Sequence, residues 1–149
     1  MKEIATHLNE IVNASSEQMK KLSAQDWEFR KAPDKWPRKE ILGHMIDSAD
    51  NNHQRFVRAQ YGDKTPISYD GNKWVSVEKH NDAPIGNLIG LWAFYNLHLA
   101  HIISNIPKEK YNVLFNADAT EPKTLEWLVQ DYMHHLVHHL NQILSRERL

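Results

Sequence analysis

The six prolines of this 149-residue chain divide it into four long stretches, in each of which apolar residues recur at helical spacing. Pro37 and Pro84 suit the first turn of a helix, because the N–H that proline lacks would have no intrahelical partner there. Thr124 is a residue type that caps the start of a helix. The chain is therefore predicted to form four helices, at about residues 2–24, 37–61, 84–107 and 124–145.

The connection predicted between the second and third helices, residues 62–79, is long and contains Pro66, Gly71 and Trp74. Loops of this length are often functional. No stretch shows a convincing alternation of apolar and polar residues, so no strand is expected. These features predict an all-α, antiparallel four-helix bundle, and the length suits one domain over residues 1–149. In such bundles, cofactor sites are built from side chains on facing helices.

The composition argues against several classes of partner. Lys and Arg number 18 against 19 acidic residues, so the chain has no strong positive field for a nucleic acid or an anionic membrane. No stretch approaches the roughly 18 apolar residues of a membrane span, and the N-terminus lacks the apolar part of a secretory signal, so a cytoplasmic protein is expected. Because cysteine is absent, metal ligands must be histidine, carboxylate or water, and thiol chemistry must use a substrate's sulfur.

Six of the ten histidines fall in two places, four within residues 134–139 and two within residues 44–53. His135 and His139 are four residues apart, so on a helix they share one face and could bind the same ion. On a helical wheel they flank the apolar stripe, whereas His134 and His138 lie nearly opposite it and are expected to face solvent or a partner subunit. Surface or packed histidines remain the competing interpretation, because catalytic zinc normally needs a third ligand.

The wheel of the second predicted helix offers two candidates for that third ligand. His53 lies on the apolar stripe, and periodicity alone favours it. His44 lies on the opposite, polar face with Asp47, Asn51 and Arg55. That face would either be solvated or line a hydrophilic cleft, and spacing does not decide between His53 and His44.

The segment from Trp36 to Phe56 resembles the DinB-like superfamily of metal-binding four-helix bundles, and most closely its YfiT-like branch. Two further segments resemble this family in order along the chain. They are the Pro, Tyr-Asp and Trp pattern within residues 66–74 and the His-x-x-His-His ending within residues 135–143. The positions that match in the first segment are Trp36, His44, Asp47, Ser48, Asn51, Arg55 and Phe56.

The resemblance implies a three-histidine metal site made of His44, His135 and His139, in place of the wheel's choice of His53. Three imidazoles suit a divalent ion, with zinc or nickel favoured. Related proteins include S-transferases that act on low-molecular-weight bacterial thiols and proteins described as metal-dependent hydrolases. The resemblance thus implies a metal-dependent enzyme with a small-molecule substrate, and a homodimer as a family-based expectation.

Supporting roles are open at this stage. Asp47 could act as a base or accept a hydrogen bond from His44, while Asn51, Arg55 and His98 could contact the substrate or simply pack. Trp74 and Tyr69 could close the cleft as a lid or pin the long loop to the bundle. A metal- or ligand-binding protein without catalytic activity, linked to stress, is the alternative function, and a bundle without metal is the third.

Overall fold

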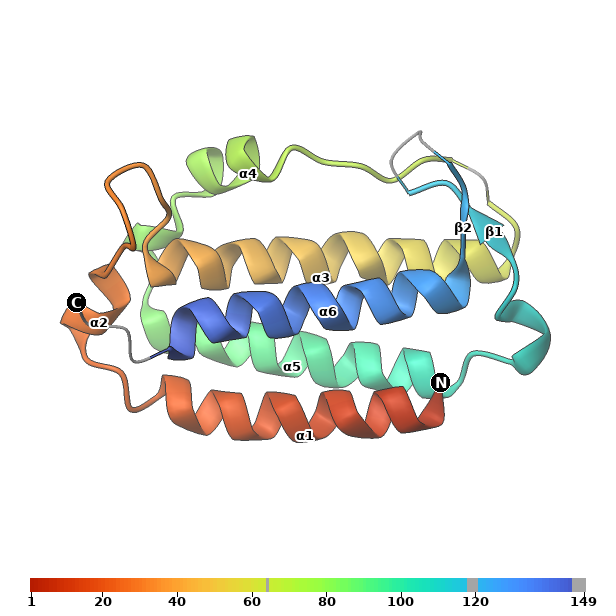
Figure 1. The fold of residues 1–149 in the computed structure, drawn as a ribbon, viewed down its shortest axis with the longest axis horizontal. Helices are drawn as coiled ribbons and strands as arrows, with labels where there is room; N and C mark the ends of the chain where they lie inside the picture. The colour runs from red at the N-terminus through yellow and green to blue at the C-terminus, as the bar shows by residue number, and fades with distance from the viewer. Residues whose placement is uncertain (64, 118–120, 146–149) are drawn as a thin grey trace.

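The computed structural model describes residues 1–63, 65–117 and 121–145, and four long helices form the body of this part (Figure 1). Shorter elements connect them, and two of these are 3-10 turns, η1 (His80–Asp82) and η2 (Lys108–Lys110). The long helices are α1 (Lys2–Met19), α3 (Arg38–Gln60), α5 (Ile85–Ser104) and α6 (Leu125–Leu144); the shorter elements are α2 (Ala24–Glu28), α4 (Gly71–Glu78), β1 (Leu114–Phe115) and β2 (Lys123–Thr124).

The start signals in the sequence mark the helix starts to within a residue. The Thr124 side chain accepts a hydrogen bond from the Trp127 N–H at 3.1 Å and caps α6. Pro37 and Pro84 were predicted to lie in the first helical turn, and they lie one residue earlier, at the capping positions of α3 and α5. The first helix ends at Met19, earlier than predicted, because Ser23 begins α2 with a reciprocal capping box.

The four long helices pack as a closed ring of neighbours, in which α1 contacts α5 and α6, and α3 contacts α5 and α6. Figure 1 shows α1 antiparallel to α5 and α3 antiparallel to α6. The connection from α3 to α5 carries α4 and returns along the length of the bundle, so α3 and α5 run parallel. The predicted all-α four-helix bundle with a long connection between its second and third helices is confirmed.

Two local predictions were wrong. The long connection contains an eight-residue helix, α4, whose first turn is capped by Asp70 through the Lys73 N–H. Short paired strands also form, with Leu114 opposite Thr124 and Phe115 opposite Lys123. Strands of two residues are too short to show an alternating pattern, which explains why the sequence did not predict them.

The core fills the space between the four long helices, with Trp92, Phe56 and Leu99 fully buried. The polar face of α3 is also buried, because the connection covers it, and Asp47 and Asn51 are each only 3% exposed. Arg55 holds the connection in place by donating from Nε and Nη2 to the Ile67 carbonyl at 3.0 and 2.7 Å. This cover creates the setting of the candidate site. Within the described ranges, no helix is long and apolar enough to cross a membrane.

Candidate metal centre

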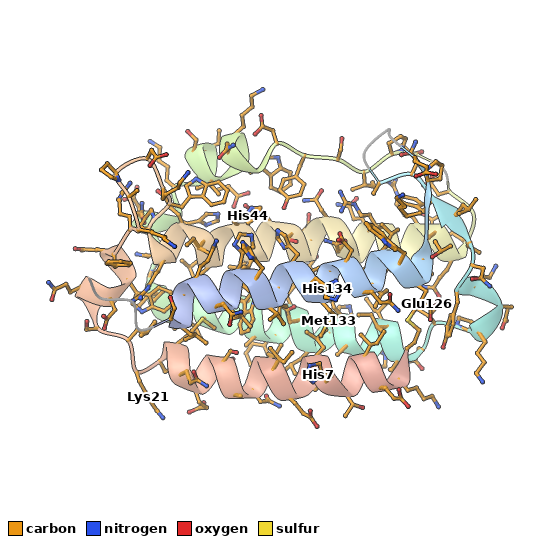
Figure 2. The ribbon with its side chains drawn as sticks, in the orientation of Figure 1. His7, Lys21, His44, Glu126, Met133 and His134 are labelled. Atoms are coloured by element: carbon orange, nitrogen blue, oxygen red, sulfur yellow. The ribbon has the colours of Figure 1, made fainter. Side chains whose placement is uncertain are left out.

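Three histidines from two helices meet beneath the connection. Figure 2 shows His44 on the side of α3 that faces α4, and His135 and His139 reach it from the neighbouring α6. His135 Nε2 lies 3.3 Å from His44 Nε2 and 3.1 Å from His139 Nε2. The structure therefore brings together the three histidines that the family resemblance named, with one ring nitrogen of each within 4.8 Å of the others.

The spacing of these nitrogens fits a metal ion. Zinc bound by imidazole has Zn–N distances of about 2.0–2.1 Å, which places the nitrogens of a tetrahedral site about 3.3–3.4 Å apart. The two short separations, 3.3 and 3.1 Å, are near this value. Three histidine ligands leave a fourth position for water or substrate, as in catalytic zinc sites. The donor set and its geometry thus suit a divalent ion.

The second ring nitrogens orient two of the imidazoles. His139 Nδ1 lies 2.8 Å from Gln142 Oε1, and since an amide oxygen only accepts, the Nδ1–H donates to it. His135 Nδ1 lies 3.3 Å from Ser48 Oγ. The Gln142 contact favours the His139 tautomer whose Nε2 has a free lone pair, as in metal-ligating histidines. The Ser48 hydroxyl can donate or accept, so its contact is compatible with the same tautomer of His135. His44 Nδ1, beside Gly71, is buried and has no hydrogen-bond partner within the described part of the chain.

The site keeps its imidazoles neutral. Burial lowers the pKa of His44 to about 4, helped by His139 and opposed by Asp47. Burial also lowers the pKa of His135 to about 3, with further lowering by the other histidines and Arg55. The pKa of His139 is likewise lowered, mainly by burial. Only a neutral imidazole binds a metal, so the three side chains are ready to act as ligands at neutral pH.

The metal-free protein should lose stability in mild acid. Below about pH 6.5 the unfolded chain protonates His44 and His135, whereas the native state resists protonation until about pH 4 and about pH 3, so the free energy of unfolding falls as the pH falls. After allowance for partial exposure, the loss should be about 2–4 kcal/mol between about pH 7 and about pH 4. Urea unfolding of metal-free wild type and His135→Gln across this range measures it. Equal pH slopes for the two proteins would contradict the prediction.

The structure places His53, the wheel's candidate, away from the three histidines. His53 Nδ1 lies 3.2 Å from the hydroxyl oxygen of Tyr95 on α5, and that hydroxyl donates to Asp50 at 2.8 Å. His98, which could have contacted a substrate, packs with its ring centroid 5.3 Å from that of His53. Both residues belong to the α3/α5 side of the bundle rather than to the α3/α6 side.

The other residues predicted for the site lie near it with partners of their own. Asn51 Nδ2 donates to the Asp47 backbone carbonyl at 2.9 Å, one turn earlier on α3. Arg55 bonds the Ile67 carbonyl, and its charge contributes to lowering the pKa of His135. Asp47 Oδ2 is buried, has no hydrogen-bond partner among the residues that the structure describes, and faces His80. Contact of these residues with a substrate stays a prediction.

Four further residues lie beside the site, and two of them, Glu78 and His80, were not predicted from the sequence. The Trp36 and Tyr69 rings lie against His44, with centroids 5.0 and 6.2 Å from the imidazole. Glu78 and His80 lie beside Asp47. Except for Trp36, all of them belong to the connection between α3 and α5. This segment has no continuous helical periodicity, so its sequence does not indicate which of its residues are buried. Trp36 was part of the family pattern, and Tyr69 was predicted to close the cleft or to pin the long loop.

Comparison with protein families matches residues 7–143 to the DinB superfamily. Among solved structures, the chain is similar to YfiT from Bacillus subtilis, described as a probable metal-dependent hydrolase with an unusual four-helix bundle topology, at a TM-score of 0.85 and 21% identity over 97% of this chain and 86% of that one. Two structures of a mycothiol-dependent maleylpyruvate isomerase match with TM-scores of 0.77 and 0.73 and identities of 11% and 12%. They cover 96% and 98% of this chain, and 60% and 67% of the isomerase chains. No curated protein sequence matches significantly.

Proposed function

The chain belongs to the DinB superfamily, and from this membership and its three convergent histidines we propose that it is a metal-dependent enzyme that transfers a low-molecular-weight thiol to an electrophile. The observation that carries the proposal is the convergence of three Nε2 atoms in an imidazole cluster held neutral by burial. His44, His135 and His139 would hold a divalent ion, with zinc or nickel as the favoured metals. A divalent ion held by these three residues would supply positive charge that lowers the pKa of a thiol or water and so favours a nucleophile near neutral pH.

Residues around the three histidines support this chemistry. The Trp36 and Tyr69 rings exclude water from one side of His44 and form an apolar wall for the carbon part of a substrate. Asp47 contributes a negative charge beside His44, which partly balances the charge of an ion. Arg55, close enough to influence His135, offers a positive charge for an acidic group of the substrate.

Two observations agree with a thiol as the substrate. The chain has no cysteine, so a sulfur nucleophile has to come from a small molecule. One structural neighbour is a mycothiol-dependent isomerase, which shows that this fold can serve an enzyme that uses a thiol. In the proposed transfer, the thiol sulfur forms a bond to an electrophilic carbon, the leaving group departs with the electrons of its own bond, and the thiol proton passes to solvent.

A specific observation also supports hydrolysis as the second candidate. The neighbour with a TM-score of 0.85 is the probable metal-dependent hydrolase YfiT. The same three histidines would then serve attack by water on a carbonyl or a related electrophile. The two candidates share the site and differ in the nucleophile, so one set of proteins can be used to test both.

The test uses zinc- or nickel-loaded protein with a fluorogenic chlorobimane as electrophile and cysteine, glutathione or mycothiol as the thiol, in parallel with a chromogenic ester. Thiol-dependent turnover that is lost in His135→Ala and kept in His134→Ala, the adjacent exposed histidine of α6, is the expected result. Ester cleavage without thiol transfer would replace the proposal by the hydrolase. Bound metal with neither activity would favour the non-catalytic metal-binding protein.

A further inference from the structure

A second cluster of ligand-type side chains lies beside the three histidines. Asp47 comes from the middle of α3, Glu78 is the last residue of α4, and His80 is the first residue of η1. One carboxylate oxygen of each acid and one ring nitrogen of His80 all lie within 4.8 Å of one another. Asp47 follows His44 by three residues on the same helix, so the two clusters are neighbours along α3.

Two buried atoms of this cluster have no hydrogen-bond partner among the described residues. Asp47 is 3% exposed and His80 is 6% exposed, and the unpartnered atoms are Asp47 Oδ2 and His80 Nε2. They lie 3.7 Å apart, which is too long for a hydrogen bond. Glu78 Oε2 lies 3.2 Å from His80 Nε2 without an aligned N–H. Buried polar atoms without a hydrogen bond are costly, so the grouping of these atoms within 4.8 Å of one another indicates a missing ligand.

The backbone is built to bring these side chains together. Lys79, between Glu78 and His80, has φ 51° and ψ 50°, the left-handed conformation that non-glycine residues rarely adopt. This turn ends α4 and lets Glu78 and His80 both face Asp47. The His80 ring is seated directly on Gly43, where an added Cβ would lie 2.1 Å from His80 Cδ2. The position of the imidazole thus depends on two unusual features of the backbone.

The two carboxylates of the cluster favour binding of a cation. Asp47 and Glu78 are two acids at close range, and burial together with the negative charge of Asp47 raises the pKa of Glu78. Within the cluster, His80 is the side chain that can become positively charged. The Asp47 carboxylate, with Glu78 and Glu40, raises the pKa of His80, whereas burial lowers it. A protonated His80 would compensate only one of the two carboxylates.

We propose that Asp47, Glu78 and His80 form a second divalent-cation site beside the three-histidine centre. One imidazole with two carboxylates is a mixed nitrogen and oxygen donor set, which suits Mn²⁺, Fe²⁺ or Zn²⁺ better than Mg²⁺ or Ca²⁺. The Glu78 side chain is 42% exposed, so an ion can approach the site from solvent on the side of Glu78. The inference does not depend on the proposed thiol transfer.

The test isolates the second site by removing the first. In the His135→Ala/His139→Ala background, metal-free protein is titrated with Mn²⁺, and the loss of the free Mn²⁺ signal in electron paramagnetic resonance reports binding. We expect about one Mn²⁺ per chain, and at least about 10-fold weaker binding when Glu78→Gln or His80→Gln is added. The matched control is Glu40→Gln, because Glu40 is also near His80 but accepts a hydrogen bond from Asn81 instead of joining the cluster.

The outcomes separate the possibilities. No Mn²⁺ binding in the background protein, or binding that Glu78→Gln leaves unchanged, would overturn the proposal and leave Asp47, Glu78 and His80 as an ion-paired group. Circular dichroism checks that the double variant folds. If it does not fold, the same Mn²⁺ titration is carried out on wild type and on Glu78→Gln, each preloaded with Zn²⁺ at the three histidines. Because the experiment measures Mn²⁺ binding, its result would stand even if the protein showed no thiol transfer.

Discussion

Replacing His135 by alanine is expected to remove metal from the three-histidine centre. His135 Nε2 is the central atom of the cluster, at 3.3 Å from that of His44 and 3.1 Å from that of His139. The variant leaves two histidines, and two imidazoles hold zinc or nickel weakly. Losing a group that merely orients a ligand weakens metal binding about 10–100-fold, so losing the ligand itself should cost more than about 100-fold.

Two measurements check this expectation. Metal content by plasma mass spectrometry should fall by about one ion per chain in His135→Ala. Thermal unfolding with and without a chelator should show that metal at about 100 times its Kd stabilises wild type by about 2.7 kcal/mol and the variant hardly at all.

His134→Ala and His53→Ala are the controls. His134 is exposed on the same helix, and His53 is held by Tyr95 on the other side of α3. Both variants should keep the ion. If His135→Ala kept the metal and His53→Ala lost it, the metal centre would involve His53, the residue of α3 that the helical wheel favoured.

Gly43→Ala is expected to be the most disruptive single methyl addition around the site. The new Cβ would lie 2.1 Å from Cδ2 and 2.2 Å from Cγ of His80, and the buried ring has to move. Overpacking of this kind typically costs about 1–3 kcal/mol, occasionally more, and it outweighs the gain of about 1 kcal/mol that alanine brings in a helix. Urea unfolding measures the net loss. Displacement of His80 should also weaken Mn²⁺ binding at Asp47 and Glu78.

Gly90→Ala provides a matched control on α5. Gly90 is also inside a helix, but an added Cβ would meet no atom of another described residue within 4 Å. This variant should therefore gain up to about 1 kcal/mol from helix propensity alone. If the two variants changed stability in the same direction and by similar amounts, His80 would not be seated on Gly43 in solution.

The sequence alone was sufficient for much of the fold. Proline placement and apolar periodicity predicted four helices, and the structure has α1, α3, α5 and α6 within a few residues of the expected ranges, except that the first helix ends early at Met19. This works because a long amphipathic helix repeats its signal over several turns. The same reasoning identified the α6 face of His135 and His139. The motif pattern then identified the family, which the comparison confirms over residues 7–143.

Apolar periodicity did not decide which residue of α3 meets His135 and His139; the family resemblance implied His44, and the tertiary structure brings His44 to them. Periodicity measures how apolar a helix face is, so it ranked His53 above His44 and left the face of Asp47 and Asn51 as either solvated or a cleft. In the structure, the α3 to α5 connection covers that polar face, and α6 brings its two histidines to its edge. The cluster of Asp47, Glu78 and His80 depends on the left-handed turn at Lys79. It also joins residues that lie about 30 positions apart in the sequence, so no local spacing encodes it.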